Sequence, residues 1–338
     1  MKIRGRTIAL GLVGLVVLVV LGGITAIGWQ IVLGPRARAV NDKKFEVTDA
    51  RLARGKYLVE GPAHCLECHS EHDLSTPEYP TIASKLGAGW ALPIPELNYI
   101  SSKNITSDKE TGLGNWTDDE IARAIREGIR KDGTALFPLM PYQNFAKLDD
   151  EDLASIVVFV RTLPAIKNEV PARNLPFPLE YIVKTIPRPI TTPQPSHPAA
   201  TAAERGSYLA TVASCGACHT PAVQGEPLPG MAFAGGELFM DPKQGAVYSM
   251  NITPDASGIA HYDEALLTQT IRTGQVSGRM LNHIMPFESF KTMTDSDISD
   301  IFGYLKTLTP VKHRISNTDP PTPCPLCKHS HGLGEMNK

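Results

Sequence analysis

The sequence predicts an all-α fold of two similar lobes with long loops, preceded by one membrane-spanning helix. Three observations support this prediction. An apolar run opens the chain, a set of short motifs occurs twice in the same order, and each copy closes with an apolar pattern of helical period. Alternation of apolar and polar residues, which indicates a half-buried strand, is scarce. We therefore expect helices to form the core of both lobes.

The predicted membrane anchor occupies residues 1–40. Three basic residues among the first six precede an apolar run from Ile8 to about Gly34. This length matches the roughly 20 residues that a helix needs to cross a bilayer and exceeds the apolar part of a secretory signal. Basic residues before the run favour a cytoplasmic N-terminus. Cleavage near the small residues Gly22, Gly23 and Ala26 is the alternative to a retained anchor.

Composition narrows the possible functions. The 338 residues carry a formal net charge of −2, so nucleic acid is not expected as a partner. The length allows more than one domain. All six cysteines fall in three C-x-x-C pairs. This spacing indicates cofactor or metal chemistry rather than a scattered disulfide framework.

Two of these pairs continue into the pattern C-x-x-C-H. The motif runs from Cys65 to His69 and again from Cys215 to His219. On one helical turn, this spacing sets two thiols at the separation of the two vinyl groups of haem and places an imidazole beneath the iron. A thioredoxin-like motif would need a βαβ pattern, and a zinc site would need further ligands at matching spacing. We therefore predict two covalently bound haem c groups, attached through Cys65, Cys68 and His69 and through Cys215, Cys218 and His219.

The two motifs occupy equivalent positions of an internal repeat. In both copies R-G-x-Y-L precedes the motif, and N-I-T-x-D, I-R-x-G and then M-P-[YF] follow it. Each copy ends in a predicted amphipathic helix with an acidic start, which Asp149 begins in the first copy and Thr294 in the second.

The repeat divides the chain into five parts. Two domains at 45–165 and 200–312 follow the anchor, and a tail occupies residues 313–338. The linker at 166–199 is rich in proline and predicts a stiff, extended connector that lies over or between the lobes.

The sixth iron ligand is predicted to be methionine in both lobes. A thioether sulfur raises the haem potential, a second imidazole lowers it, and an open site permits small-molecule chemistry. Met140 is the only methionine between Met1 and Met231, and Met285 is its repeat equivalent in the same Met-Pro turn. His283 stays an alternative ligand, and the second lobe offers further methionines at 231, 240, 250, 280 and 293. His64 and His72 are interpreted as surface residues or propionate neighbours.

The order of these motifs resembles the class I cytochrome c fold, and over residues 48–312 it resembles the cytochrome subunits of membrane-bound alcohol, aldehyde and gluconate dehydrogenases. The resemblance implies that the first and last helices of each lobe cross beside a haem. It implies one haem held by Cys65, Cys68, His69 and Met140 and another held by Cys215, Cys218, His219 and Met285. Those subunits usually carry three haem domains and relay electrons from a dehydrogenase to ubiquinone, whereas this chain has two lobes.

The predicted function is electron transfer without catalysis. We expect a di-haem cytochrome between a respiratory donor, a dehydrogenase or the quinol pool, and an acceptor such as a soluble cytochrome or a terminal oxidase. No nucleophile elbow, zinc-protease motif or phosphate loop occurs. The predicted location is a bacterial inner membrane, with the N-terminus cytoplasmic and the haem domains periplasmic. The alternatives are a di-haem peroxidase, in which one iron keeps an open site, and a cytochrome subunit of a dehydrogenase complex.

The third cysteine pair lies in the tail. Lys328 stands where a proximal histidine would follow Cys324 and Cys327. A third haem, a metal site completed by His329 and His331, and a disulfide are the three interpretations. We predict an extension held by a disulfide or a metal.

Overall fold

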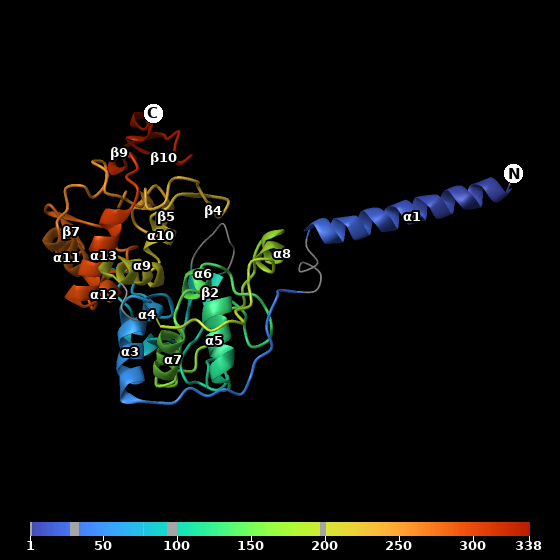
Figure 1. The fold of residues 1–338 in the computed structure, drawn as a ribbon, viewed down its shortest axis with the longest axis horizontal. Helices are drawn as coiled ribbons and strands as arrows, with labels where there is room; N and C mark the ends of the chain where they lie inside the picture. Colours follow the sequence, from blue (N-terminus) through green and yellow to red (C-terminus); the bar gives the residue numbers. More distant parts are fainter. Residues whose placement is uncertain (1, 28–33, 77, 93–99, 197–200) are drawn as a thin grey trace.

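The computed structural model describes residues 2–27, 34–76, 78–92, 100–196 and 201–338 (Figure 1). Residues 1 and 28–33 of the predicted anchor and 197–199 of the predicted linker lie outside these ranges. Two helical lobes lie beside each other, and helix α1 (Lys2–Ile27) extends away from them.

The first lobe is built around helices α3 and α7, which pack against each other. The short elements between them carry long loops. The elements of this lobe are α3 (Asp49–Glu60), α4 (Cys65–Cys68), the 3₁₀ turn η1 (Ala83–Lys85), β1 (Trp90–Leu92), β2 (Ile100–Ser102), α5 (Asp118–Glu127), α6 (Tyr142–Phe145) and α7 (Asp150–Val160).

The second lobe repeats this plan, with α9 packed against α13. Its elements are α9 (Ala202–Val212), α10 (Cys215–Cys218), β3 (Ala222–Val223), β4 (Glu226–Pro227), β5 (Leu238–Asp241), β6 (Gly245–Tyr248), α11 (Glu264–Thr273), β7 (Gln275–Val276), β8 (Arg279–Met280), α12 (Phe287–Phe290) and α13 (Asp295–Thr307). The tail adds β9 (Ser316–Pro323), β10 (Ser330–Gly332) and a 3₁₀ turn η3 (Gly334–Met336).

A glycine allows the two helices of each lobe to cross closely. A Cβ on Gly55 of α3 would lie 2.0 Å from the carbonyl oxygen of Ser155 in α7. A Cβ on Gly206 of α9 would lie 1.9 Å from the carbonyl oxygen of Asp300 in α13. Any larger residue would force the backbones apart. The glycine of the R-G-x-Y-L repeat is therefore required by packing in both lobes.

The predicted starts of the two last helices are confirmed. The Asp149 side chain accepts a hydrogen bond of 2.6 Å from the backbone N–H of Asp152, and the Thr294 hydroxyl accepts one of 3.1 Å from that of Asp297. Each cap satisfies an N–H group that has no partner inside its own helix. The apolar faces that follow enter two separate hydrophobic clusters, one in each lobe.

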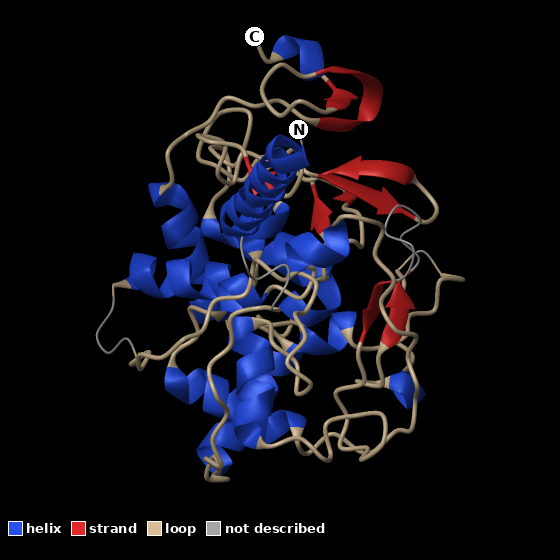
Figure 2. Cartoon of the chain, turned by 90° about the vertical axis from the view of Figure 1, so that its right-hand side faces the viewer, coloured by secondary structure: helices blue, strands red, loops and turns tan. Residues whose placement is uncertain are grey.

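The prediction of an all-α fold is wrong. Within the described ranges, strands pair into five antiparallel sheets of two strands each: β1 with β2, β3 with β4, β5 with β6, β7 with β8, and β9 with β10. Figure 2 shows these strands in red outside the helices. All except β9 are two to four residues long, too short to produce a recognisable alternation of apolar and polar residues.

The predicted membrane-spanning helix is also wrong. In the part of the chain that the structure describes, no helix has the length and apolar character needed to cross a bilayer. The described N-terminal helix, α1 (Lys2–Ile27), does not meet this requirement. The anchor at 1–40 and the inner-membrane location, with a cytoplasmic N-terminus and periplasmic lobes, are therefore corrected.

The linker packs on the first lobe. It contains a short helix, α8 (Leu179–Val183), and the side chains of Leu175 and Val183 are buried against Ile100 and Ala135. The connector therefore lies over the first lobe and is helical in part rather than extended throughout.

Candidate haem-binding sites

Both C-x-x-C-H motifs form a single helical turn after a left-handed residue. The turn follows His64, with φ of 37°, in the first lobe and Ser214, with φ of 58°, in the second. The backbone N–H of His69 donates to the carbonyl of Cys65, and that of His219 donates to the carbonyl of Cys215, each at 2.9 Å. None of the six cysteines forms a disulfide. Each turn therefore presents two free thiols and an imidazole with the expected local geometry.

A backbone carbonyl orients each of these imidazoles. Nδ1 of His69 lies 2.6 Å from the carbonyl oxygen of Lys103, and Nδ1 of His219 lies 2.7 Å from that of Met250. Because a carbonyl can only accept, Nδ1 carries the proton and Nε2 keeps the lone pair that binds a metal. Burial lowers the pKa of both histidines, which favours the neutral imidazole that ligates iron.

The N-I-T-x-D motif fixes these carbonyls. The amide of Asn104 accepts a bond of 2.9 Å from the N–H of Thr106 and donates one of 2.7 Å to the carbonyl of Ile166. Asn251 makes the same two bonds, at 2.9 Å to Thr253 and 2.8 Å to Val311. The residue before each asparagine supplies the carbonyl that holds the histidine. The sequence showed that this motif repeats but not its role, because the contact joins segments more than 30 residues apart.

The two Met-Pro turns also have equivalent geometry. The N–H of Tyr142 donates to the carbonyl of Met140 at 2.8 Å, and that of Phe287 donates to the carbonyl of Met285 at 2.7 Å. Met140 packs against the hydrophobic cluster that Cys65 also contacts, and Met285 packs against the cluster that Cys215 contacts. Each predicted sulfur ligand and its haem-attachment cysteine therefore border the same core.

The remaining methionines of the second lobe have other surroundings. Met231 and Met293 are buried, and Met293 belongs to the hydrophobic cluster. Met240 and Met280 are 62% and 50% exposed. The backbone carbonyl of Met250 accepts the hydrogen bond from Nδ1 of His219, so Met250 lies on the same side of the site as the proximal histidine. Met285 is the methionine in the position equivalent to Met140.

The three other histidines near the sites have different environments. His64 packs edge-on against Phe290 of the second lobe, with ring centroids 5.5 Å apart. Both ring nitrogens of His72 lie 2.5 Å from carbonyl oxygens, those of Tyr79 and Glu67, so both are already occupied by hydrogen bonds. His283 contacts the ring of Phe287 next to the Met285 turn.

The residues directly before the two motifs both contact the opposite lobe, since His64 packs against Phe290 and Ser214 is hydrogen-bonded to Asn144. Burial is the largest of the causes that raise the pKa of the Cys68 thiol to about 12, and the negative charges of Glu67 and Cys218 contribute to the same shift. The amide of Asn144 donates a 3.0 Å hydrogen bond to the hydroxyl of Ser214, directly before the second motif. The two sites therefore face a common boundary.

The residues of both lobes fit a covalently bound haem c. Each lobe offers two unpaired thiols on one turn, a neutral imidazole with Nε2 available, and a thioether on the same core. These are the donor types of a His/Met-ligated cytochrome c. The thiols would form the thioethers, the imidazole would be the proximal ligand, and the methionine would complete the iron's coordination.

Comparison with known proteins relates the chain to cytochromes c. Residues 203–309 match the cytochrome c family. The chain is 32% identical over 282 residues to the fructose dehydrogenase cytochrome subunit of Gluconobacter japonicus. This alignment covers 79% of the chain and 54% of the relative. It is 28% identical over 280 residues to the gluconate 2-dehydrogenase cytochrome c subunit of Pantoea cypripedii, covering 78% and 60%.

The alignment with a third relative covers more of the chain. The alcohol dehydrogenase (quinone) cytochrome c subunit of Gluconobacter oxydans is 26% identical over 312 residues, covering 84% of this chain and 61% of the relative. The chain thus spans between about half and three fifths of the length of these relatives. It contains a cytochrome c domain, which implies covalently bound haem c, and it is related to the cytochrome c subunits of fructose, gluconate and alcohol dehydrogenases.

Proposed function

We propose that the chain is a di-haem electron-transfer cytochrome that serves a dehydrogenase. One haem c is bound by Cys65, Cys68, His69 and Met140, and the other by Cys215, Cys218, His219 and Met285. Bound haem supplies reversible one-electron chemistry. The observation that carries the proposal is the equivalent donor set in each lobe, with the same carbonyl contact to the histidine in both.

The residues of the chain have distinct roles in this function. The cysteines fix the position of the cofactor, so that its edge keeps one orientation. The carbonyls of Lys103 and Met250 hold the two imidazoles and increase their basicity as ligands. The thioethers of Met140 and Met285 favour the reduced iron and raise its potential. The hydrophobic clusters exclude water from one side of each site.

The contact between the lobes supports electron transfer from one site to the other. The hydrogen bond from Asn144 to Ser214 joins the helix after the Met140 turn to the second attachment segment, and His64, directly before the first motif, packs against Phe290 of the second lobe. A relay needs its two redox centres held at a constant short separation. Contacts next to the haem-attachment motifs hold the two redox centres at a constant separation more directly than contacts far from the motifs would.

A redox titration of the purified haem-loaded protein, followed by absorption, tests the function. We expect two haems per chain, one on each C-x-x-C-H peptide after proteolysis. Both should show the far-red band of methionine–iron ligation and titrate at high potential. One haem per chain would refute the di-haem proposal. A haem that lacks this band and reacts rapidly with peroxide would refute it in favour of a peroxidase.

The partner is tested separately. The names of the relatives support a dehydrogenase as the electron donor. Affinity purification of the tagged chain from its own cells should recover a flavin or quinone dehydrogenase whose substrate reduces both haems. Recovery of the cytochrome without any dehydrogenase activity would contradict this part of the proposal and leave the haem assignment intact.

A further inference from the structure

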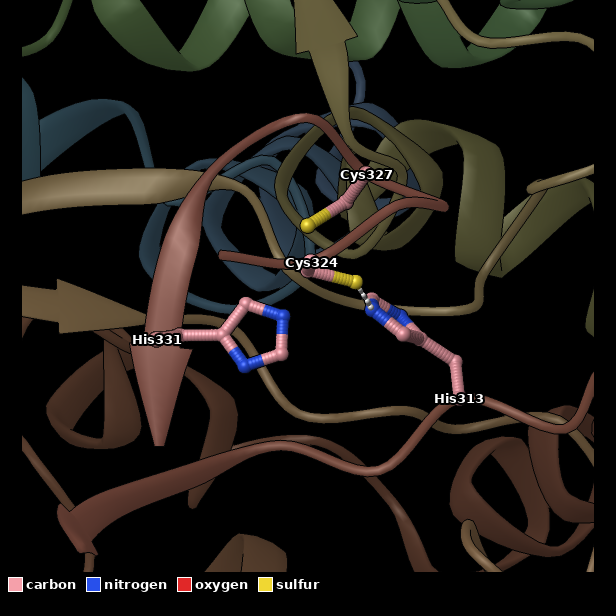
Figure 3. Close-up of side chains that lie close together, drawn as sticks. All are labelled: His313, Cys324, Cys327 and His331. Atoms are coloured by element: carbon pink, nitrogen blue, oxygen red, sulfur yellow. Dashed lines mark hydrogen bonds between the residues drawn. The ribbon is translucent and has the colours of Figure 1, made fainter. Parts of the chain in front are cut away.

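The tail of the chain brings four metal-binding side chains together. His313, Cys324, Cys327 and His331 are all buried, and their ligand atoms all lie within 4.8 Å of one another (Figure 3). Their exposed fractions are 0%, 4%, 0% and 0%. His313 lies between α13 and β9, both cysteines lie in the turn between β9 and β10, and His331 lies in β10. This cluster belongs to neither of the two haem sites.

The side chains have the orientation of a metal site. Nε2 of His313 lies 3.4 Å from the sulfur of Cys324. Ligand atoms of a tetrahedral zinc ion with bonds of 2.0–2.3 Å lie roughly 3.3–3.8 Å apart, so this pair already has the required separation. The two imidazole rings stand at 74° with centroids 5.2 Å apart. Figure 3 shows both rings next to the two sulfurs.

The surrounding backbone fixes the imidazoles as it does in known metal sites. Nδ1 of His313 lies 2.9 Å from the carbonyl of Ala234, and Nδ1 of His331 lies 2.9 Å from that of Gly332. Both rings therefore carry the proton on Nδ1 and keep Nε2 for a ligand. Nε2 of His331 is buried and has no hydrogen-bond partner among the described residues. A buried ring nitrogen without a partner indicates a ligand at this position.

A side-chain donor also reaches one of the two sulfurs. The side-chain amide of Asn337 donates to the sulfur of Cys324 at 3.6 Å. Lys328 adopts a left-handed φ of 68°, which turns the chain directly after Cys327. Hydrogen bonds to sulfur are typical of coordinated thiolates, which carry more negative charge than a disulfide sulfur.

We propose that His313, Cys324, Cys327 and His331 form a tetrahedral structural zinc site. Two thiolates and two neutral imidazoles balance the charge of Zn²⁺, so the buried centre is electrically neutral. The closed set of four protein ligands leaves no position for substrate, and burial excludes solvent. Binding releases the thiol protons. The site therefore cross-links the tail, and the contact of His313 with the carbonyl of Ala234 attaches it to the second lobe.

The zinc site contacts the loop that is hydrogen-bonded to the backbone of His219, the proximal histidine of the second lobe. His313 contacts the carbonyl of Ala234, and the N–H of the next residue, Gly235, donates to the carbonyl of His219 at 2.7 Å. A Cβ on Gly236 would lie 2.7 Å from His313 and 3.4 Å from the sulfur of Cys327. The zinc site therefore holds the loop that positions His219. Loss of the metal is expected to disturb the second haem and to leave the first unchanged.

Elemental analysis and zinc-edge X-ray absorption of the full haem-loaded chain test the proposal. The zinc edge is separate from that of haem iron. We expect one zinc per chain, with two sulfur scatterers near 2.3 Å and two nitrogen scatterers near 2.0 Å. A zinc-free protein whose tail peptide is two mass units lighter would show a disulfide and overturn the proposal. Tail thiols that are free and bind no zinc on addition would overturn it, as would iron in excess of haem.

Variants provide a second, independent test. Cys327→Ser and His331→Gln should each lose the zinc, while His329→Gln should retain it. His329 is a suitable control because it is the neighbouring imidazole and lies outside the cluster. Zinc lost equally in all three variants would contradict the assignment of His331. If the ligand variants fail to fold, a chelator can remove zinc from the wild-type protein instead. We then expect the absorption spectrum of the second haem to shift and that of the first to stay unchanged.

Discussion

The hydroxyl of Tyr208 donates a hydrogen bond of 2.7 Å to the carboxylate of Asp152, which joins the first helix of the second lobe to the last helix of the first. The reverse contact also exists, since the hydroxyl of Tyr57 donates to Asp297. The tyrosines are repeat equivalents, and both carboxylates occupy the first turn of a last helix. The lobes therefore associate through a reciprocal pair of contacts, consistent with a pseudo-twofold relationship.

The Tyr208 contact gives the first prediction. Tyr208→Phe removes a hydrogen bond to a buried carboxylate and should lower the free energy of unfolding by about 1–3 kcal/mol, measured by denaturant titration of the haem-loaded protein. Tyr57→Phe should have a similar effect. Tyr181→Phe is the control, because Tyr181 is 44% exposed on the linker helix and should change stability little. Unchanged stability in both interface variants would mean that the lobes do not depend on these bonds.

The close helix crossing gives the second prediction. Gly206→Ala places a Cβ 1.9 Å from the Asp300 carbonyl and should destabilise the second lobe by more than about 3 kcal/mol. Gly303→Ala is a matched control in the same helix pair, since a Cβ there meets nothing within 4 Å. It should stabilise the protein by about 0.5–1 kcal/mol through its better helix propensity. Thermal melts of the two variants should therefore shift in opposite directions.

The axial ligands give the third prediction. Met140→Leu should remove the methionine–iron band from one haem and lower its potential by on the order of 100 mV or more, with the other haem unchanged. Met285→Leu should affect the second haem in the same way. Met280→Leu is the control and should shift neither potential, because Met280 is half exposed. A second-lobe band that survives in Met285→Leu would transfer the role to another ligand, with His283→Ala as the next variant.

The segment before the first lobe gives the fourth prediction, on pH. Burial alone would raise the pKa of Asp119, but hydrogen bonds from the Arg38 guanidinium and the N–H of Asn41 outweigh it and lower the pKa. A carboxylate with a lowered folded pKa contributes stability above its unfolded pKa of about 4, and this stability is lost as pH falls through the folded value. Asp119→Asn should therefore destabilise the protein at pH 7 and flatten its loss of stability below about pH 4. A variant with the same acid profile as the wild type would contradict the prediction.

Local sequence signals predicted the elements that depend on neighbouring residues. The caps at Asp149 and Thr294 and the turns that carry the cysteine motifs are encoded within a few positions, and the structure has them where expected. The small sheets were missed because their strands are too short to show a period. The anchor was predicted from a count of apolar residues, and no described helix meets the requirements for crossing a bilayer.

Contacts between distant segments could not be predicted. The carbonyls of Lys103 and Met250 carry no side-chain signal, and only the fold brings them to the histidines. In the tail, the sequence indicated Cys324, Cys327 and His331 but also His329, which lies outside the cluster. His313 was missed because it precedes β9 and no spacing rule connects it with the cysteine pair. Its proximity to Cys324 depends on the β9–β10 hairpin.

The central claim is that the two lobes form one electron relay. Photochemical injection of a single electron into the oxidised di-haem protein, followed by time-resolved absorption, tests it most directly. The account predicts that the electron redistributes between the two haems at a rate independent of protein concentration. Redistribution at a rate proportional to protein concentration would show transfer between molecules and would contradict the account.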